Sequence, residues 1–429
     1  MRYAIIGSSA AGISAVEAIR SKDKKSDITV ISDEKKPLYS RCLISYLLAG
    51  TIDKDKIWIR PDDFFKKNKA EAILGVRAEK IDLKNREVYL KNKEKVKFNK
   101  LLIATGSSPK IDDVPGNDKK GVFPLRTLAH AVQIQAALDK VKSVAVLGGG
   151  LIGLRAAYAL RSRGKDVSIF VRSPQILSQI IDEESAGIMQ RHIEKKGIKI
   201  FTGRYAREIK GKLSVEGLAL DNGSDVDCQL VVVGKGVSPN IEIAKEAGLE
   251  TNWGIVVDSS LRAGSKDVFA AGDVVEGHDI ALEENTINAI WPVACEQGRI
   301  AGLNMSGEDQ VYDGTLAMNS IEFFGLSVIS IGITKPKKAI YKEIVKKDLS
   351  NNKYKKIVLR DDVIVGAIFV NAIENIGVIG ALIKNKVNVK DIKDIALENY
   401  FDYGRIIKII KDSKDGFREK EFRETILTL

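Results

Sequence analysis

Short apolar runs that end near a glycine recur along this chain and predict buried strands. In the first of them, Tyr3–Ile6 leads into a turn, and after Gly12 the apolar residues Ile13, Val16 and Ile19 follow at helical spacing. The chain is therefore predicted to begin with a strand, a tight turn and a helix.

The turn between this strand and helix has the spacing of a phosphate-binding loop. Gly7, Ser9 and Gly12 occupy the glycine positions of the pattern G-x-G-x-x-G, with Ser9 in place of the middle glycine. The first glycine allows a sharp turn and the last allows the helix to pack closely on the strand, while a serine is small enough to leave room for a phosphate. Backbone amides and the positive end of the helix dipole then face a bound pyrophosphate.

A second unit of the same kind has the complete glycine pattern. Val144–Leu147 runs into Gly148, Gly150 and Gly153 in full G-x-G-x-x-G register, and Leu154–Arg163 is predicted to be the helix. One such match is weak evidence, but two, each between a strand and a helix, predict two bound nucleotides. A chain that binds two nucleotides is built to pass electrons between them.

Charged residues after the second strand of each unit indicate which nucleotide it binds. Asp33 and Glu34 follow the strand Ile28–Ile31, about 20 residues beyond the glycines, where a carboxylate accepts hydrogen bonds from an adenosine ribose. Alternatively, they are loop carboxylates. The strand Val167–Val171 ends instead in Arg172, which suits the 2′-phosphate of NADPH. The alternative is that Arg172 stacks on adenine and the protein accepts NADH, so both nucleotides remain candidates.

Further apolar runs end where ligands of α/β sheets bind. Lys97–Ile103 is predicted to be a strand that runs into Ala104–Gly106, and Val231–Gly234 closes the second unit. Val268–Asp273 is another buried strand, and it ends in an aspartate. Asp273 at this position can hold a ribityl hydroxyl or order a water on a pyrophosphate.

Towards the end of the chain, the strand-turn-helix units with glycine turns give way to a predicted hairpin, a short helix and a charged tail. Lys356–Leu359 and Val363–Val370 are predicted to form a hairpin, and Asn375–Lys384 a short helix. The tail Val389–Leu429 is charged and carries isoleucines at helix-like spacing. We expect this tail to dock a partner subunit, and the alternative is a helix folded on its own domain. The isoleucines of the tail are Ile406, Ile407, Ile409 and Ile410.

Composition narrows the class of protein. A length of 429 residues predicts two or three domains, and 44% apolar with 29% charged residues is typical of a globular enzyme. No apolar run approaches the roughly 20 residues of a membrane helix, so we expect a cytoplasmic protein without a membrane. The net charge of +11 could indicate an acidic partner or nucleic acid, but lysines spread along the whole length favour a solvated surface and no nucleic acid.

The three cysteines limit the redox chemistry. Cys42, Cys228 and Cys295 lie far apart in the sequence, which excludes a disulfide framework and a zinc or iron-sulfur ligand set, so no metal site is expected. Redox chemistry must then use an organic cofactor or a single thiol. Cys42 lies beside Arg41 and near a predicted helix start, and both features favour a thiolate. The alternative is a small buried hydrophobe.

The glycine turns and strand ends together resemble a known superfamily. Gly7–Gly12, Ala104–Gly106, Gly148–Gly153 and Gly272-Asp273 occur in the order and spacing of the FAD-dependent pyridine nucleotide-disulfide oxidoreductases, from Met1 to about Ile383. The resemblance implies an α/β fold with two Rossmann-like nucleotide-binding domains, for FAD and NAD(P), and a C-terminal α+β interface domain. The implied boundaries are residues 1–115 and 241–322 for FAD, 116–240 for NAD(P), and 323–429 for the interface domain with its helical tail.

The resemblance also implies roles for single residues. Asp33 and Glu34 are expected at the adenosine ribose, Ala78 at the adenine, and Arg41 and Asp273 on the flavin side. The residues predicted to bind FAD are Gly7, Ser9, Ala10, Ala11, Gly12, Asp33, Glu34, Arg41, Ala78, Ala104, Thr105, Gly106, Arg126, Gly272, Asp273, Pro292, Val293 and Ala294. Those predicted to bind NAD(P) are Gly148, Gly150, Leu151, Ile152, Gly153, Arg172 and Gly236.

Two features concern catalysis. In relatives, a segment like Trp291–Ala294 starts a helix whose positive end faces the flavin pyrimidine. Where most relatives have a glutamate beside flavin and nicotinamide, this chain has Arg155, a cation that would attract the reduced flavin anion. The alternative is that Arg155 faces solvent. Leu151 occupies the position at which disulfide reductases have an aromatic residue that covers the nicotinamide pocket, so the resemblance implies a less covered pocket here. Arg155 and Cys42 are thus the catalytic candidates.

The dithiol motifs of thioredoxin and glutathione reductases are missing, which argues against ordinary disulfide reduction. Asp33–Arg41 looks like the ferredoxin and rubredoxin reductase branch. Tyr39–Cys42, Arg155 and Gln297–Gly302 look most like the flavin subunit of NADH-dependent phenylglyoxylate dehydrogenase and aldehyde oxidoreductase complexes, and like the front of assimilatory nitrite reductase.

We therefore expect a flavoprotein that takes a hydride from NADH or NADPH onto FAD and passes electrons singly to an iron-sulfur or rubredoxin-type acceptor protein or partner subunit. A homodimer is a further expected assembly, because in relatives the C-terminal unit packs near the flavin or makes a dimer. A second hypothesis is an NADH oxidase or coenzyme A-disulfide reductase that uses Cys42. A third is a flavin-bearing, non-catalytic subunit.

Overall fold

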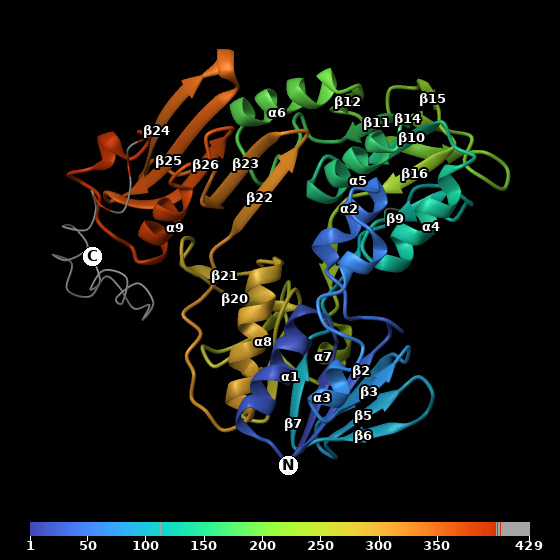
Figure 1. The fold of residues 1–429 in the computed structure, drawn as a ribbon, viewed down its shortest axis with the longest axis vertical. Helices are drawn as coiled ribbons and strands as arrows, with labels where there is room; N and C mark the ends of the chain where they lie inside the picture. The colour runs from blue at the N-terminus through green and yellow to red at the C-terminus, as the bar shows by residue number, and fades with distance from the viewer. Residues whose placement is uncertain (112, 400, 402–403, 405–429) are drawn as a thin grey trace. The chain divides into compact units, whose positions relative to one another are not determined.

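The computed structural model describes residues 1–111, 113–399, 401 and 404, and these residues cluster into two compact units (Figure 1). The first unit comprises residues 1–172, 198–278 and 284–315. The second comprises residues 173–197, 279–283 and the described residues from 316 onward. Ile406, Ile407, Ile409 and Ile410 of the predicted tail helix lie outside the described residues, and the domain boundaries given above stay a prediction.

The first unit contains a parallel sheet at its amino-terminal end. Its strand order is β19-β7-β1-β2-β3, and every neighbouring pair is parallel. Parallel strands covered on both faces need continuous apolar runs, and Ala4 to Ile6 are buried accordingly. The strands are β1 Arg2–Ile6, β2 Asp27–Ser32, β3 Ala70–Leu74, β7 Lys100–Ile103 and β19 Val268–Ala270.

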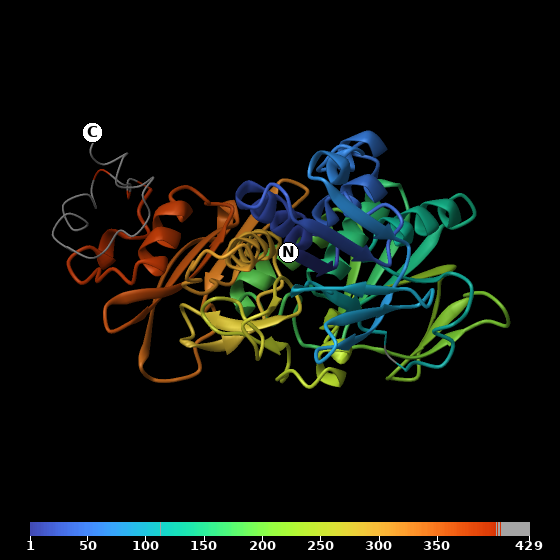
Figure 2. The same cartoon turned by 90° about the horizontal axis from the view of Figure 1, so that it is seen from below.

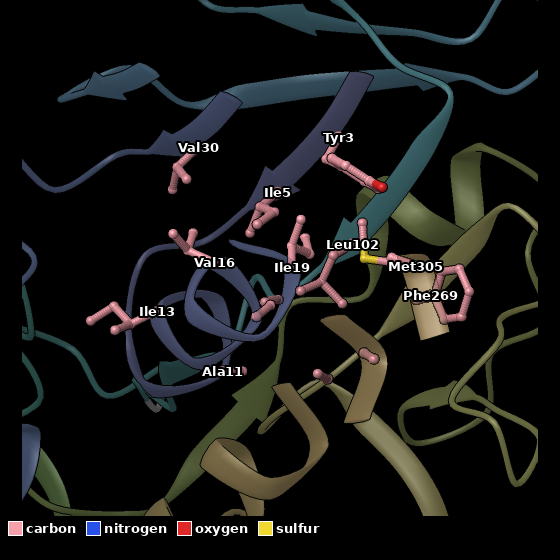
Figure 3. Close-up of a cluster of buried hydrophobic side chains, with 14 of the residues drawn as sticks. Tyr3, Ile5, Ala11, Ile13, Val16, Ile19, Val30, Leu102, Phe269 and Met305 are labelled. Atoms are coloured by element: carbon pink, nitrogen blue, oxygen red, sulfur yellow. The ribbon is translucent and has the colours of Figure 1, made fainter. Parts of the chain in front are cut away.

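Two helices lie side by side against this sheet, as Figure 1 and the view from below in Figure 2 both show. They are α1 (Ala10–Lys22) and α8 (Trp291–Met305). Glycines bring them into close contact, because a Cβ added at Gly298 would lie 2.1 Å from the Ala11 carbonyl oxygen. The apolar face of α1 packs on β1 and β2 in the core drawn in Figure 3, which includes Ile5, Val16 and Val30.

A second parallel sheet follows in the same unit, in the order β12-β11-β10-β16-β9. The helix after its glycine turn begins at Leu151, three residues before the predicted Leu154, because the turn residues already adopt helical geometry. The elements are β9 Val122–Pro124, α4 Leu128–Leu138, β10 Ser143–Leu147, α5 Leu151–Ser162, β11 Asp166–Val171, β12 Ile198–Thr202 and β16 Leu230–Val233.

Two predicted strands of the first unit are wrong in their bounds. Val268–Asp273 is a strand only as far as Ala270, and Gly272 then turns the chain with a φ of +87°. Lys97–Ile103 forms parts of two strands, because the chain turns at Phe98 and Asn99, whose amides donate to the carbonyls of Arg86 and Arg2. Small sheets, antiparallel except for the parallel pair β18-β20, and short helices complete the unit. They are β4 Ala78–Asp82, β5 Glu87–Leu90, β6 Lys95–Lys97, β8 Ser107–Pro109, β13 Ala206–Lys210, β14 Gly217–Leu220, β15 Asp225–Asp227, β17 Val237–Pro239, β18 Ile255–Val256, β20 Val275–Asp279, β21 Glu284–Thr286, α2 Ile44–Ala49, α3 Phe64–Lys67 and α7 Glu242–Glu246.

The second unit is built on an antiparallel sheet in the order β22-β23-β26-β25-β24. The predicted hairpin and short helix are confirmed as β25-β26 and α9. Both strands are almost continuously buried, and Asp361 and Asp362 join them with positive φ values. Apolar residues of β25, β26 and α9 form its core. The elements are α6 Glu183–Lys195, β22 Met318–Phe323, β23 Leu326–Gly332, β24 Tyr341–Asp348, β25 Lys353–Arg360, β26 Val363–Val370 and α9 Ile376–Lys384.

The predicted fold class is confirmed, since two parallel α/β sheets precede an α+β part. In the part of the chain that the structure describes, no helix has the length and apolar character needed to cross a bilayer. The same residues contain no group of three or more histidine, cysteine, aspartate or glutamate side chains arranged to hold a metal ion.

Candidate functional site

A cleft opens at the carboxyl ends of the strands of the first sheet, where ligands of parallel α/β folds bind. It gathers residues from the first glycine turn, from the end of β7, from the end of β19 and from the start of α8. The predicted FAD residues that line it are Gly7, Ser9, Ala10, Ala11, Asp33, Glu34, Arg41, Ala104, Thr105, Gly106, Arg126, Gly272, Asp273 and Ala294, and Cys42 lines it too.

A second cavity shares residues with the cleft and extends the binding surface. Gly7, Asp33 and Thr105 line both. Ala78, predicted at the adenine, lies in this second cavity, together with Arg77 and other residues of the first unit. Two hollows that share lining residues suit an extended ligand such as a dinucleotide, with its adenosine end towards Ala78.

The first glycine turn forms a cradle that side chains would fill. A Cβ at Gly7, where φ is +112°, would lie 2.0 Å from the Ala104 carbonyl oxygen, and one at Gly12 would lie 1.9 Å from the Gly7 carbonyl oxygen. Gly12 packs against Gly7 and Ile5 on the side of the turn away from the cleft, and it is not among the residues that line the cleft. A Cβ at Gly106, in contrast, would meet nothing within 4 Å. The cleft is therefore open beside Gly106, after β7, while close backbone packing at Gly7 and Gly12 shapes the first glycine turn.

One buried hydroxyl in this cradle points to a polar ligand. Ser8 is only 3% exposed, lines the cleft, and finds no hydrogen-bond partner for its Oγ atom among the described residues. An unsatisfied buried hydroxyl is costly, and phosphate or ribityl oxygens of a bound dinucleotide would satisfy it. The residues present thus fit a flavin dinucleotide.

The two carboxylates after β2 have different surroundings. Glu34 forms an ion pair with Arg41 and accepts a hydrogen bond of 2.6 Å from the Tyr39 hydroxyl. Burial raises the pKa of Tyr39, which therefore stays a donor. Asp33 is exposed and lies in both cavities. The arrangement favours Asp33 for the ribose contact, while Glu34 positions Arg41.

Two arginines bring positive charge into this cleft, and each pairs with a carboxylate, Arg41 with Glu34 and Arg126 with Asp273. Arg41 Nε donates to Ser9 Oγ at 3.3 Å in the glycine turn, and Arg41 also donates to the carbonyl of Arg126 at 3.2 Å. Arg126 donates to Asp273 Oδ2 at 2.6 Å and to Ser107 Oγ at 2.7 Å. The Ser107 hydroxyl in turn donates to Asp273 at 2.9 Å. Arg41 and Arg126 are therefore held where a pyrophosphate would need countercharge.

The start of α8 reaches the cleft through Trp291 and Ala294, whereas Pro292 and Val293 are not among the residues that line it. A proline in the first turn suits a helix start, because its missing N–H needs no partner there. Gln297 is 3% exposed and accepts a hydrogen bond of 2.8 Å from the Gly272 amide. This bond ties α8 to the strand end that carries Asp273.

Cys42 does not have the character that the sequence predicts. Its side chain is exposed in the cleft, but desolvation by the surrounding atoms raises the pKa of its thiol, although Ser40 and Arg155 oppose the rise. Cys42 lies in a short 3-10 turn, Arg41–Leu43, which has no developed helix dipole. The surroundings of Cys42 thus oppose the expected thiolate, although α2 begins two residues later at Ile44, and a catalytic role of Cys42 stays a prediction.

Arg155, on α5, is turned towards α2. Its guanidinium donates to the Tyr46 hydroxyl at 2.9 Å and lies 4.9 Å from the centre of the Tyr46 ring. Arg155 is half-buried and is not one of the described residues that line the cleft. It is nevertheless near enough to Cys42 to lower the thiol pKa.

The second glycine turn is built like the first. A Cβ at Gly148, where φ is +118°, would lie 2.5 Å from the Gly234 carbonyl oxygen, and one at Gly153 would lie 2.0 Å from the Gly148 carbonyl oxygen. A Cβ at Gly150 would meet nothing within 4 Å, which leaves an open side for phosphate. Leu151 and Ile152 begin α5 there, and Gly236 follows β16 with φ of +90°.

Several residues of the cleft were missed by the sequence patterns. Ser107 directly follows the predicted strand end at Gly106, and Trp291 begins the helix expected at the flavin, so both carried a signal. Ser8 lies inside the Gly7–Gly12 turn, Ala271 inside Val268–Asp273, and Ser32 directly after Ile28–Ile31, so these residues carried a signal too, whereas Ala289 belongs to no predicted motif. The missed residues are Ser8, Ser32, Ser107, Ala271, Ala289 and Trp291.

Comparison with known families agrees with this geometry. Residues 1–298 match the family model described as pyridine nucleotide-disulphide oxidoreductase. Residues 318–387 match the model described as the rubredoxin NAD+ reductase C-terminal domain.

The chain is similar to several characterised proteins. It is 33% identical over 343 residues to an NADH oxidase of Methanocaldococcus jannaschii, covering 78% of this chain and 76% of the relative. It is 31% identical over 411 residues to NADH-dependent phenylglyoxylate dehydrogenase subunit epsilon of Aromatoleum evansii, covering 95% and 97%. It is 30% identical over 379 residues to NADH-rubredoxin oxidoreductase of Clostridium acetobutylicum, covering 88% and 90%.

Solved structures share this architecture. The NADH:rubredoxin oxidoreductase of Clostridium acetobutylicum superposes with a TM-score of 0.75 at 26% identity, covering 92% of this chain and 98% of that one. A covalent putidaredoxin reductase-putidaredoxin complex superposes with a TM-score of 0.86 at 20% identity, covering 96% and 99%, which shows a common fold.

Proposed function

Because the chain belongs to the pyridine nucleotide-disulphide oxidoreductase family, we propose that it is a FAD-dependent NAD(P)H oxidoreductase that passes electrons to an iron-sulfur or rubredoxin-type protein. The observation that carries this proposal is the cleft in which Arg41, Arg126 and Asp273 meet the first glycine turn, together with a second glycine turn of the same build. One cleft supports FAD, and the second turn supports the nicotinamide nucleotide.

Different residues of the cleft are proposed to bind different parts of FAD. Arg41 and Arg126 supply positive charge to the pyrophosphate, and the amides of the first turn of α1 add their dipole. Asp33 accepts from the adenosine ribose, and Asp273 from the ribityl chain. Gly7 and Gly12 keep the backbone close enough for these contacts.

The chemistry that a bound flavin supplies is acceptance of a hydride from NAD(P)H and release of its electrons one at a time. The protein's own contribution is positional and electrostatic. The start of α8 directs the positive end of its dipole into the cleft, which favours negative charge on the ring system there. Arg155 adds a fixed cation on the α2 side.

The electron acceptor is proposed to be another protein. The described residues hold no cluster of metal-ligating side chains, so the one-electron carrier lies outside them. Relatives named for rubredoxin and for a subunit of phenylglyoxylate dehydrogenase cover most of the chain, which supports a small redox protein or a partner subunit. The net charge of +11 favours rapid encounter with an acidic partner.

A spectroscopic titration tests the proposal. We expect the purified holoprotein to be yellow and its flavin absorbance to bleach when NADH or NADPH is added without oxygen. The bleached protein is then mixed with oxidised rubredoxin or a [2Fe–2S] ferredoxin, and we expect the flavin absorbance to return as the acceptor is reduced. A flavin that neither nucleotide bleaches would instead support the non-catalytic subunit.

The second candidate function is that of an NADH oxidase or coenzyme A-disulfide reductase. It is favoured by the exposed Cys42 thiol in the cleft and by the similarity to an NADH oxidase. Cys42→Ser separates the two functions, because reduction of a protein acceptor should persist while reduction of a disulfide or of peroxide should be lost. Cys295→Ser is the matched control.

The proposal also places the enzyme in the cytoplasm, as a subunit of a complex or as a homodimer. Neither nucleic acid nor a membrane takes part. Light scattering of the purified chain measures the homodimer directly, and purification from the source cell with its partners retained measures the complex.

A further inference from the structure

His130 lies in the first turn of α4 and caps the start of this helix. The His130 amide donates to Thr127 Oγ1 at 3.3 Å, and the Thr127 amide donates to His130 Nδ1 at 3.4 Å. In the usual form of this capping box, a glutamate or glutamine side chain is the second acceptor. Here the acceptor is an imidazole nitrogen, which accepts only while it carries no proton.

The same nitrogen holds the backbone at Arg126. The Arg126 amide donates to His130 Nδ1 at 3.3 Å, and the Arg126 carbonyl accepts a hydrogen bond of 3.2 Å from the Arg41 guanidinium. The backbone of Arg126 is therefore fixed through its amide by His130 and through its carbonyl by Arg41. From this backbone, the Arg126 guanidinium reaches Asp273 in the cleft at 2.6 Å.

A tyrosine hydroxyl ties the start of α4 to the same group of charges. The Leu128 amide donates to the Tyr39 hydroxyl oxygen at 3.1 Å, and this hydroxyl donates to Glu34 at 2.6 Å. Glu34 in turn forms the ion pair with Arg41. Hydrogen bonds thus run from the start of α4 through three side chains and back to the residue before its cap.

The surroundings of His130 favour its neutral form. Burial lowers the pKa of His130 below its ordinary value, Glu34 opposes this shift, and Arg41 adds to it. The amides at a helix start also disfavour a positive charge. Apart from His130, α4 has no charged or titratable side chain, and α2 and β9, which pack against it, have no charged one. Tyr46 is the titratable residue of α2, and Arg126 is the remaining charged neighbour.

We propose that His130 is a positioning residue of the FAD site, whose neutral imidazole holds the backbone of Arg126, and that acid releases this hold and weakens FAD binding. Protonation of Nδ1 removes the acceptor of two amides and adds a positive charge near Arg41. The contribution of the neutral imidazole is present above the ordinary histidine pKa, and it is lost as the pH falls through the lowered one. This inference rests on the proposed function, because it concerns the cleft to which FAD is assigned.

Release of flavin at different pH values tests the inference without catalysis. The holoprotein is diluted at several pH values from 7.5 to 4.5, and the fluorescence of the released flavin gives the affinity for FAD. We expect the affinity to fall roughly tenfold on acidification, as for the loss of two hydrogen bonds between uncharged groups. His130→Leu has no acceptor at this position and should show the lower affinity already at pH 7.5.

His130→Asn separates a titrating acceptor from a merely structural side chain. The asparagine oxygen stands as many bonds from the backbone as Nδ1 does, accepts from the same amides and does not titrate. We expect this variant to bind FAD like the wild type at pH 7.5 and to keep most of that affinity at pH 4.5. His278→Asn is the matched control, because His278 is an exposed histidine of the same unit that lines a different cavity, and its pH profile should equal that of the wild type.

Nitrogen-15 NMR of the imidazoles measures the protonation state directly, and the signal that His130→Asn lacks belongs to His130. At pH 7.5 we expect Nδ1 of His130 to be unprotonated and Nε2 to carry the proton. Circular dichroism shows whether each variant is folded, and the NMR measurement and His130→Asn decide the matter even where His130→Leu does not fold.

The outcomes separate failure of the inference from failure of the proposed function. A proton on Nδ1 at pH 7.5, flavin retention in folded His130→Leu equal to the wild type, or undiminished acid release in His130→Asn would overturn the inference while the protein still holds FAD. A protein that binds no FAD at any pH would overturn the proposed function itself.

Discussion

The guanidinium of Arg126 and the carboxylate of Asp273 form an ion pair of 2.6 Å between residues 147 positions apart in the sequence. Arg126 precedes α4, and Asp273 follows β19, so the pair joins two separate segments at the cleft. Ser107 contacts both partners and completes a small polar cluster.

Loss of Arg126 should weaken retention of FAD. Arg126→Ala removes a countercharge for the pyrophosphate and leaves Asp273 with a hydrogen bond from Ser107 alone among the contacts described above. We expect the affinity for FAD to fall roughly tenfold or more, as for lost hydrogen bonds between charged groups. The fluorescence of flavin released on dilution measures this affinity. Arg86→Ala, which breaks an exposed ion pair with Asp267, is the control and should leave flavin retention unchanged.

A side chain at Gly7 should disrupt the first glycine turn. In Gly7→Ala, the new Cβ would lie 2.0 Å from the Ala104 carbonyl oxygen at a φ of +112°, so the backbone must move. We expect a loss of roughly 3 kcal/mol in unfolding free energy and a colourless protein. Denaturant unfolding and the ratio of visible to ultraviolet absorbance measure the two effects. Gly223→Ala, where φ is +83° and a Cβ meets nothing within 4 Å, should cost only about 1 kcal/mol and leave the protein yellow.

The Cys42 thiol should be slow to react at neutral pH. Desolvation by the atoms around the thiol disfavours the thiolate and raises the pKa of Cys42, although the residue is exposed in the cleft, so the neutral thiol predominates at pH 7 and the reactive fraction grows as the pH rises. We expect alkylation by iodoacetamide to accelerate about tenfold per pH unit from pH 7 to pH 9, without a plateau. Mass spectrometry of the Cys42 peptide gives the rate.

Arg155→Ala adds a control to the alkylation experiment. The charge of Arg155 lowers the pKa of Cys42, so its removal should raise that pKa further and slow alkylation at every pH below it. A variant that reacts as fast as the wild type would show that Arg155 exerts no field at the cleft. Arg155→Lys keeps the charge and should react like the wild type.

A buried ion pair should make the second unit sensitive to acid. Lys356 is 2% exposed and lies 2.7 Å from Asp182, which also accepts a hydrogen bond of 2.7 Å from the Tyr354 hydroxyl. Burial alone would raise the pKa of Asp182, but hydrogen bonds from Lys356, Ser185 and Tyr354 outweigh it and hold the pKa below its ordinary value. Stability from this carboxylate is therefore present above the ordinary aspartate pKa and is lost as the pH falls through the lowered one.

Substitution of Asp182 checks this pH dependence. Asp182→Asn leaves Lys356 with Glu343 as its carboxylate partner among the described residues, so we expect a loss of about 3 kcal/mol at pH 7 and a smaller further loss on acidification than in the wild type. Denaturant unfolding at pH 7 and pH 3.5 measures both. Asp225→Asn removes an exposed carboxylate paired with Lys210 and should change the stability by under 1 kcal/mol. Equal acid sensitivity of Asp182→Asn and the wild type would contradict the assignment.

Local patterns predicted much of the fold and part of the cleft. The strands β1, β2, β10 and β11 appear within one residue of their predicted starts, because apolar runs and glycine turns act over a few neighbouring residues. The patterns predicted wrong strand bounds where a hydrogen bond to a distant segment interrupts a strand. This happens at Phe98 and Asn99, whose amides donate to carbonyls elsewhere in the first unit. The raised pKa of the Cys42 thiol likewise depends on atoms that only the folded chain brings around it.

The sequence by itself determined two strand-turn-helix units with the glycines of a phosphate cradle, because φ above zero and close backbone approach restrict the residue type at single positions. The tertiary structure alone decided which charges meet. Asp273 pairs with Arg126, and the Arg172 guanidinium lies over the Tyr205 ring. Such contacts depend on the approach of segments far apart in the chain, and residue order carries no direct record of that approach.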